Sequence, residues 1–293
     1  MIKNSLFKGV TLVGLGATSY GMLATFVKLA YSKGYTTAEV TSSQFILGII
    51  GVLSILLFQK RTNFQVKPSS KNIFQLMLAG TSLGMTSVFY YLCVKYINVS
   101  IAIVLLMQTV WMGVLLEWIL DKKIPSLKKI CAVLLVLLGT LLATNILSNT
   151  ISIDWKGVFW GLLAAASFTT TMFTANKVAL ELSTAQRSLF MLLGGAVIVF
   201  FFSIYTQQTA FNYSIFLEYG LFLALFGTII PPLLMNAGFP LTGIGLGSIV
   251  SSLELPVSVL MAFFILNEQV ILFQWIGIVL ILVAIVLMNI PKK

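Results

Sequence analysis

Runs of about 20 predominantly apolar residues recur along the whole sequence. About 20 residues of α-helix cross the hydrocarbon core of a bilayer, and a segment in lipid must satisfy its own backbone hydrogen bonds. Each run therefore predicts a transmembrane helix, and we expect an all-α integral membrane protein with ten transmembrane helices. The expected spans are Lys8 to Tyr31, Thr37 to Phe58, Asn72 to Lys95, Asn98 to Leu120, Leu127 to Ile146, Trp155 to Asn176, Ala185 to Thr206, Ile215 to Gly238, Gly243 to Leu266 and Ile271 to Ile290.

The composition supports a chain that stays in the bilayer. Only 9% of the 293 residues are charged and 59% are hydrophobic, whereas soluble domains carry roughly 25% charged residues. A cleaved signal would be one short apolar segment near the start, so we expect none. The longest connection, residues 59–71, leaves no room for a separate soluble domain.

The net charge of +10 indicates topology rather than nucleic acid binding, because the basic residues lie in short gaps between apolar runs. With a cytoplasmic amino terminus, four basic residues fall outside: Lys28, Lys33, Lys95 and Lys156. The inner side receives Lys3, Lys8, Lys60, Arg61, Lys67, Lys71, Lys122, Lys123, Lys128, Lys129, Lys177, Arg187, Lys292 and Lys293. This bias predicts two cytoplasmic termini in the plasma membrane, which would be the inner membrane of a bacterium.

The two halves of the chain resemble each other in hydropathy. At a spacing near 146, Ile119-Leu120-Asp121-Lys122-Lys123-Ile124 aligns with Ile265-Leu266-Asn267-Glu268-Gln269-Val270. Five helices per half is an odd number, so residues 1–148 and 149–293 are predicted to form two inverted five-helix repeats around a central cavity. The loss of both lysines from the second loop agrees, because that loop then lies outside.

Inverted repeats have a functional consequence. Two similar halves of opposite orientation allow two nearly equivalent packings, each open to one side of a shared midplane site, and this is alternating access. A duplicated bundle with a purely structural role is the alternative.

The chain resembles an EamA-type member of the drug/metabolite transporter superfamily over essentially its whole length. The resemblance rests on the five-plus-five layout and on the closing helices, where Glu254, Pro256 and Asn267-Glu268-Gln269 precede a last helix containing Gly277. The family usually has Glu-Pro and Gly-Glu-Arg there, so this chain departs by one inserted leucine and by the changed triplet.

The resemblance implies a basket of helices whose cavity is lined mainly by the first, third, fourth, sixth, eighth and ninth spans. It implies a secondary transporter of small organic molecules, with export of amino acids or related metabolites as the first expectation. Import of a cationic or aromatic nutrient such as choline or a vitamin is the alternative. A protein of another functional class, a channel or a membrane binding module, is the alternative to a transporter.

The sequence does not favour an enzyme. It contains no histidine, and its two aspartates, Asp121 and Asp154, lie at span ends. Cys93 and Cys131 lie inside predicted spans without the spacing of a zinc site. We therefore expect no catalytic residues, no cofactor and no metal, and the expected partners are the lipid bilayer, a small-molecule substrate and, as a hypothesis, protons. Monomer and homodimer both stay open.

Glu254 is the main candidate for the chemistry, because it lies near the middle of a predicted span, where an ionised carboxylate needs a partner, a proton or a wet cavity. Gly247, Ser251, Glu254 and Ser258 share one helix face, which should point inward. Glu254 could carry a proton or bind a cationic group, or it could fix the bend at Pro256. A spacing of 146 makes Gln108 its equivalent, with Trp111 nearby.

Other candidates for substrate binding lie on helices expected to face the cavity. They are the polar Ser167, Thr170 and Thr171 of the sixth span, the aromatic Tyr20, Tyr90 and Tyr91, and Asn236, which follows the helix-breaking Pro231-Pro232. Polar stripes of this kind also hold helices together, so packing is the alternative. Glu117 lies close to a span end, near Lys122 and Lys123, and is expected to pair with these lysines.

Overall fold

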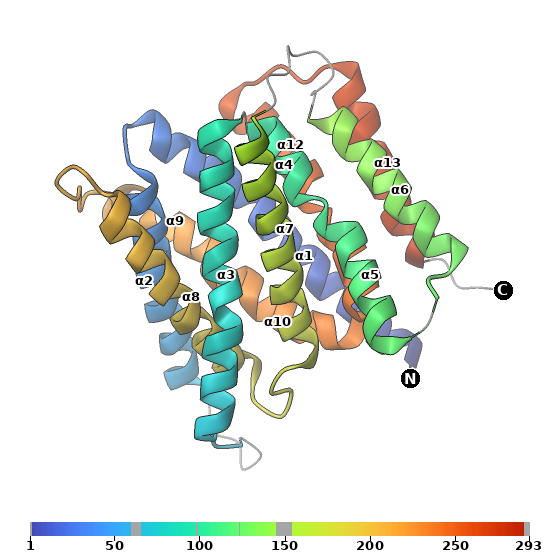
Figure 1. Ribbon diagram of the computed structural model, residues 1–293, viewed down its shortest axis with the longest axis horizontal. Coiled ribbons are helices and arrows are strands. Elements are labelled where there is room, and N and C mark those ends of the chain that lie inside the picture. The colour runs from blue at the N-terminus through green and yellow to red at the C-terminus, as the bar shows by residue number, and fades with distance from the viewer. Residues whose placement is uncertain (1, 60–65, 98, 123, 145–153, 290–293) are drawn as a thin grey trace.

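A computed structural model describes residues 2–59, 66–97, 99–122, 124–144 and 154–289, and the regular elements in these ranges are helices (Figure 1). They are α1 (Ile2–Ser32), α2 (Thr37–Phe58), α3 (Ser70–Tyr96), α4 (Val99–Leu106), α5 (Thr109–Asp121), α6 (Leu127–Ala143), α7 (Trp155–Lys177), α8 (Thr184–Thr206), the π-helical η2 (Phe216–Gly220), α9 (Leu221–Ala224), the π-helical η3 (Leu225–Ile229), α10 (Ile230–Thr242), α11 (Ile244–Ser251), α12 (Glu254–Leu266) and α13 (Leu272–Asn289).

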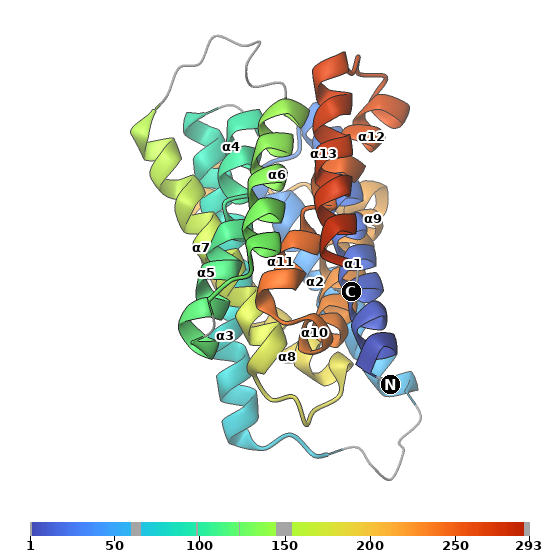
Figure 2. The same ribbon diagram turned by 90° about the vertical axis from the view of Figure 1, so that its right-hand side faces the viewer.

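Eight helical segments within the described ranges are long and apolar enough to cross a membrane. The shorter α6 and α13 lie side by side at one edge of the bundle (Figures 1 and 2). The predicted all-helical membrane fold is therefore confirmed, whereas the count of ten spans stays a prediction. Three predicted span ends, at Asn98, Ile146 and Ile290, lie outside the described residues.

The fourth and ninth spans, predicted to be continuous, are each divided into two helices. Between α4 and α5 the backbone forms short i→i+3 bonds, from Gln108 to Leu105 and from Val110 to Met107. Similar i→i+3 bonds, from Ser252 to Ile249 and from Leu253 to Val250, separate α11 from α12. In the second break Pro256 has no N–H for the carbonyl of Ser252.

The eighth span contains two wide π-helical turns, η2 at its start and η3 just before Pro231 and Pro232. Proline cannot donate to the carbonyl four residues earlier, so the helix must change its hydrogen bonding there. The prediction of an interrupted span at these prolines agrees with this geometry.

Equivalent helices of the two halves have closely matching ends. Capping boxes begin both α2, at Thr36, and α8, at Ser183. The left-handed residues that end α5 and α12 are Lys122 and Asn267. These two residues lie 145 positions apart, and so do the first residues of the two helices, Thr109 and Glu254. Thr109, rather than Gln108, is therefore equivalent to Glu254. The boundary between the halves, predicted at residue 148, lies outside the described residues.

Small residues bring α3 close to α8. A Cβ atom on Gly80 would lie 2.2 Å from the carbonyl oxygen of Met191, and one on Gly84 would lie 2.3 Å from that of Gly195. Only glycine allows this approach, so Gly80 and Gly84 act as packing residues, as their spacing predicts.

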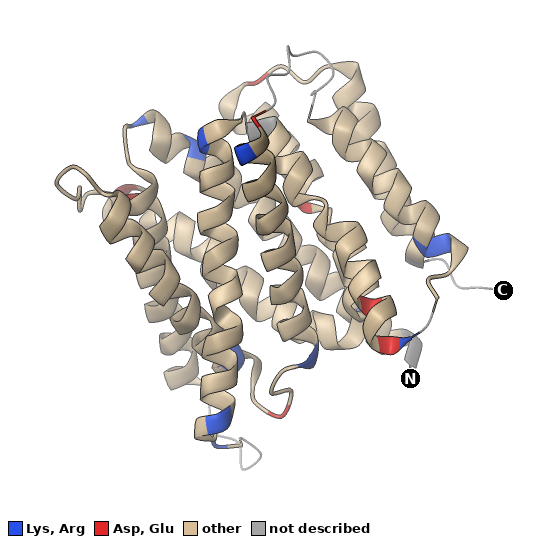
Figure 3. Ribbon diagram, viewed as in Figure 1, with Lys and Arg blue, Asp and Glu red and all other residues tan. Residues whose placement is uncertain are grey.

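Charged residues lie mainly toward the two ends of the bundle (Figure 3). Arg187, which the sequence places among the cytoplasmic anchors, lies in the first turn of α8 but is only 3% exposed. Its guanidinium donates hydrogen bonds to the carbonyls of Thr174, Ala175 and Val178 at the end of α7 and to that of Asn236 in α10. Arg187 therefore caps one helix and ties it to another.

Candidate functional site

A cavity of about 470 Å³ lies between α1, α3, α4 and α12 and extends from the middle of the bundle to one end. We call this end the open end; there α1 and α3 finish, α12 finishes and α13 begins. The opposite end, where α1 begins and α13 finishes, is the closed end (Figure 2). The volume is in the range of small-molecule sites in proteins, roughly 300–1,000 Å³.

Glu254 lies in the cavity wall, in the first turn of α12 directly after the break in the ninth span. Tyr20 of α1 and Tyr90 of α3 are close enough to interact with its carboxylate electrostatically. Among the described residues, no hydrogen bond or ion pair to that carboxylate is present. The inward direction predicted for Glu254 therefore agrees with the structure.

Aromatic rings surround the same space. Tyr90 and Tyr91 have ring centroids 6.2 Å apart, and Tyr31 lies edge-on to Tyr91 at 6.4 Å. Deeper in the cavity, Tyr20 meets Phe168 of α7 edge-on at 6.1 Å. Three of the predicted site residues, Tyr20, Tyr90 and Tyr91, are thus brought together with Glu254.

An ion pair between Lys28 and Glu268 lies at the mouth of the cavity, where both side chains are well exposed. Nearby, the side-chain amide of Gln274 donates to the carbonyl of Ala143 and so joins α13 to α6. The sequence analysis counted Lys28 only among the outer charges and used Glu268 only in the repeat alignment and the family motif, so neither was predicted as a site residue. The signal for this wall was the helical spacing of Tyr20, Ala24, Val27 and Tyr31 in α1, which all line the cavity.

Seven of the predicted site residues do not line this cavity, and the first five are Gln108, Trp111, Ser251, Ser167 and Thr170. Gln108 donates to the carbonyl of Val104 and accepts from the indole of Trp111, which is 37% exposed on the outer surface. Ser251 is buried and donates to the carbonyl of Gly247. Ser167 and Thr170 also lie outside the wall, and the Thr170 hydroxyl donates to the carbonyl of Ala166.

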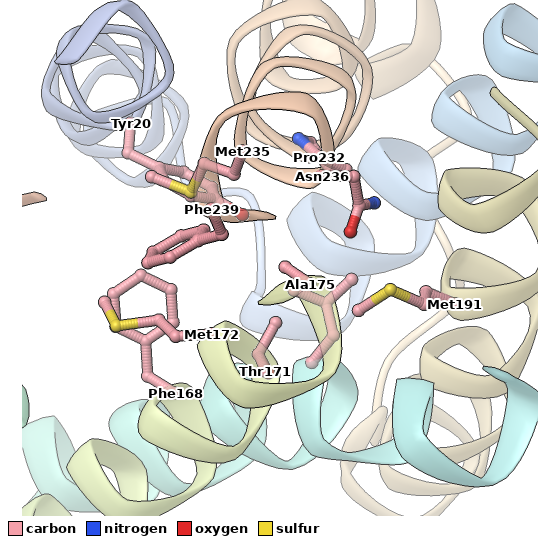
Figure 4. Close-up of a pocket in the computed structure, with 11 residues that line it drawn as sticks. Tyr20, Phe168, Thr171, Met172, Ala175, Met191, Pro232, Met235, Asn236 and Phe239 are labelled. Atoms are coloured by element: carbon pink, nitrogen blue, oxygen red, sulfur yellow. The ribbon is translucent and has the colours of Figure 1, made fainter. Parts of the chain in front are cut away.

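The other two predicted residues, Thr171 and Asn236, line a separate space of about 20 Å³ beneath the main cavity. In Figure 4, Met235 and Phe239 of α10 face Phe168 and Met172 of α7 across it. This volume holds about one water molecule. The described residues therefore offer no passage for a larger molecule from the cavity to the closed end.

The closed end is sealed where α5 packs against α11. A Cβ atom on Gly113 would lie 2.6 Å from the side chain of Ser248, whose hydroxyl donates to the carbonyl of Val110 at 3.1 Å. Glu117, predicted to pair with Lys122 or Lys123, instead forms an ion pair with Lys129 of α6.

The Glu117 carboxylate also reaches the start of α11. A Cβ atom on Gly245 would lie 2.4 Å from its Oε2, and one on Gly243 would lie 3.0 Å from its Oε1. A negative charge is favourable at a helix amino terminus, where backbone N–H groups are unpaired. Glu117 therefore links α5, α6 and α11 at the closed end.

The two repeated halves, the divided spans and a cavity open at one end together define a polytopic helical membrane protein of the transporter type. The sequence model of the EamA-like transporter family matches residues 7–145 and 155–290, so the chain belongs to the EamA-like transporter family. The resemblance seen in the sequence is thereby confirmed, and the family places the chain in the drug/metabolite transporter superfamily as a multi-pass membrane protein.

A solved structure titled "Crystal structure of protein" has a similar fold. The TM-score is 0.79 at 14% sequence identity, over 94% of this chain and 97% of that chain. At this identity the likeness concerns the fold alone. No curated protein matches the sequence.

Proposed function

We propose that this protein is a secondary transporter that moves small organic molecules by alternating access. The observation that carries the proposal is the difference between two equivalent helix crossings. At the closed end α5 packs along α11, whereas at the other end the equivalent α12 and α4 stand on either side of an accessible cavity. Exchange of these two arrangements would move the opening from one side of the membrane to the other.

The predicted orientation of the chain indicates to which side of the membrane the cavity opens. Because α1 begins and α13 finishes at the closed end, cytoplasmic termini would make the cavity open to the outside in this conformation. The plasma membrane is the proposed location. Export of amino acids or related metabolites, the first expectation from the family, requires loading from the opposite conformation, and import of a cationic or aromatic nutrient would begin from this one.

Counterflow in proteoliposomes tests the proposed function. Vesicles that contain the purified protein are loaded with an unlabelled ligand, and uptake of the labelled ligand is followed without any imposed ion gradient. A carrier with alternating access should show transient accumulation above equilibrium and saturation. Uptake that never exceeds equilibrium would support a channel instead.

Proton coupling through Glu254 is the second part of the proposal. A carboxylate in the cavity wall, facing Tyr20 and Tyr90 with Lys28 and Glu268 at the mouth, can exchange protons with the side to which the cavity opens. Glu254→Gln removes that proton site and keeps the shape. Flux driven by a pH gradient should be lost in this variant, and unchanged gradient-driven flux would refute the coupling.

A further inference from the structure

We propose that the cavity takes small organic monocations, amines or quaternary ammonium compounds attached to an apolar or aromatic body. This inference rests on the proposed function, because it names the cargo of the same cavity. It starts from the charges of the described residues that line the wall: Lys28, Glu254 and Glu268.

Two of these charges compensate each other. Lys28 and Glu268 form an ion pair at the mouth, with side chains 61% and 43% exposed. Glu254 lies deeper and has no ion pair among the described residues. The interior of the cavity therefore carries one uncompensated acid, and a cationic group of the cargo would supply the missing partner.

The same wall disfavours anions, and it offers a charged partner to only one of the two charged groups of an amino acid. A carboxylate in the interior would meet Glu254 and no lysine or arginine from the described lining, because Lys28 is already paired. The ammonium group of an amino acid could approach Glu254, but its carboxylate would be limited to neutral donors such as Gln44 and the tyrosine hydroxyls. The charge balance thus favours a cation over a zwitterion.

The aromatic rings of the wall indicate what the rest of the ligand, beside its charged group, should be. Tyr20, Tyr31, Tyr90, Tyr91 and Phe168 present both faces and edges to a space of about 470 Å³. Aromatic faces attract ammonium groups through their quadrupole, and this attraction does not require an N–H donor. An apolar or aromatic body can fill the space beside the charged group.

The test compares probes of one shape and different charge. Binding to the full-length protein in nanodiscs is measured by calorimetry for phenethylamine, its N,N,N-trimethyl derivative, phenylalanine and 3-phenylpropionate. We expect both cations to bind at least tenfold more tightly than phenylalanine and 3-phenylpropionate. Equal or tighter binding of phenylalanine or 3-phenylpropionate would overturn the inference without any variant.

Variants then identify the group responsible. Glu254→Gln should weaken both cations at least tenfold, and Glu254→Asp should restore part of that loss. The matched control is Glu181→Gln, an exposed acid in the connection between α7 and α8, which should leave both affinities unchanged. Unaltered cation binding in a folded Glu254→Gln protein would overturn the role of the acid.

The aromatic part has its own variant. Tyr91→Leu should weaken the trimethyl derivative, whereas Tyr91→Phe should retain its affinity. Equal losses in both variants would contradict cation–ring attraction at this position.

These measurements are independent of transport. Tight binding of phenylalanine followed by its counterflow would refute the cation inference and leave the transporter proposal intact. Tight binding of phenethylamine without counterflow would refute transport and leave the cation site intact.

Discussion

The two ends of the molecule are built from equivalent segments but differ in packing. At the closed end Gly113 of α5 meets Ser248 of α11. With the spacing of 145 that relates the halves, the corresponding residues at the open end are Ser258 and Ile103, and both line the cavity. A glycine allows close approach of two backbones, and larger side chains hold them apart.

The charges differ in the same way. Glu117 and Lys129 form a mostly buried ion pair at the closed end, with side chains 19% and 22% exposed. The corresponding residues at the open end, Ala262 and Gln274, are neutral and line the cavity mouth. The closed end therefore has a contact that the open end cannot form, which explains why this conformation is sealed on one side only.

The largest effect is expected from Gly113→Leu, which should separate α5 from α11. The new side chain has no space beside Ser248, and overpacking of this kind costs typically 1–3 kcal/mol. The thermal unfolding midpoint should fall clearly. The matched variant Ser258→Leu extends into the cavity and should lower the midpoint much less. Equal losses would show that the two crossings are packed alike.

A smaller effect is expected from Glu117→Gln, which breaks the ion pair with Lys129 and leaves the start of α11 without a charged partner. For a pair that is mostly buried we expect roughly 1–2 kcal/mol in favour of opening the closed end, or about tenfold in population. Ser248 is fully buried in that seal. A Ser248→Cys probe should therefore react about tenfold faster with an impermeant maleimide in the Glu117→Gln background.

The probe requires a protein without its own thiols, so every protein whose labelling rate is compared also carries Cys93→Ala and Cys131→Ser. Glu181→Gln, which lies outside the seal, serves as the control and should leave the labelling rate unchanged. A rate that is the same in Glu117→Gln and in the control would mean that the ion pair does not stabilise closure.

The smallest effect is expected from two exposed ion pairs, one at each end of the molecule. Lys28 of α1 pairs with Glu268 after α12, and Lys177 of α7 lies 3.7 Å from Asp121 at the end of α5. Exposed pairs contribute about 0–1 kcal/mol and are weakened by salt. Lys28→Gln and Lys177→Gln should each change the counterflow rate less than about threefold, with smaller changes at high salt. A change above about tenfold at either end would show that this pair controls opening.

Much of the architecture was predictable from local patterns. Apolar runs locate the long helices, and the loss of Lys122 and Lys123 in the second half agrees with inverted repeats. Glu254 was predicted because an ionisable residue in the middle of an apolar helix is unusual. Tyr20, Tyr90 and Tyr91 were predicted because they lie on helices that the family resemblance places at the cavity.

The failures arise where two helices must be placed relative to each other. Gln108 was matched to Glu254 because the loop sequences align at 146, but the helix breaks follow 145, and one position turns a side chain by about 100°. Trp111 consequently faces outward, and Thr109 occupies the equivalent place, where its hydroxyl bonds to that of Thr169. A hydropathy pattern cannot resolve a shift of one residue.

The order of residues was enough to establish that this chain is a membrane protein built from two repeats and that one acid lies within an apolar span. The inverted orientation of the two repeats stays a prediction. Hydrophobicity, loop charge and helix length act along the chain, so these properties can be read locally. The packing of the helices was needed to establish which end is sealed, that Lys28 meets Glu268, and that four tyrosines line one cavity with Glu254. Those contacts join residues far apart in the chain, and their geometry depends on how the two halves pack.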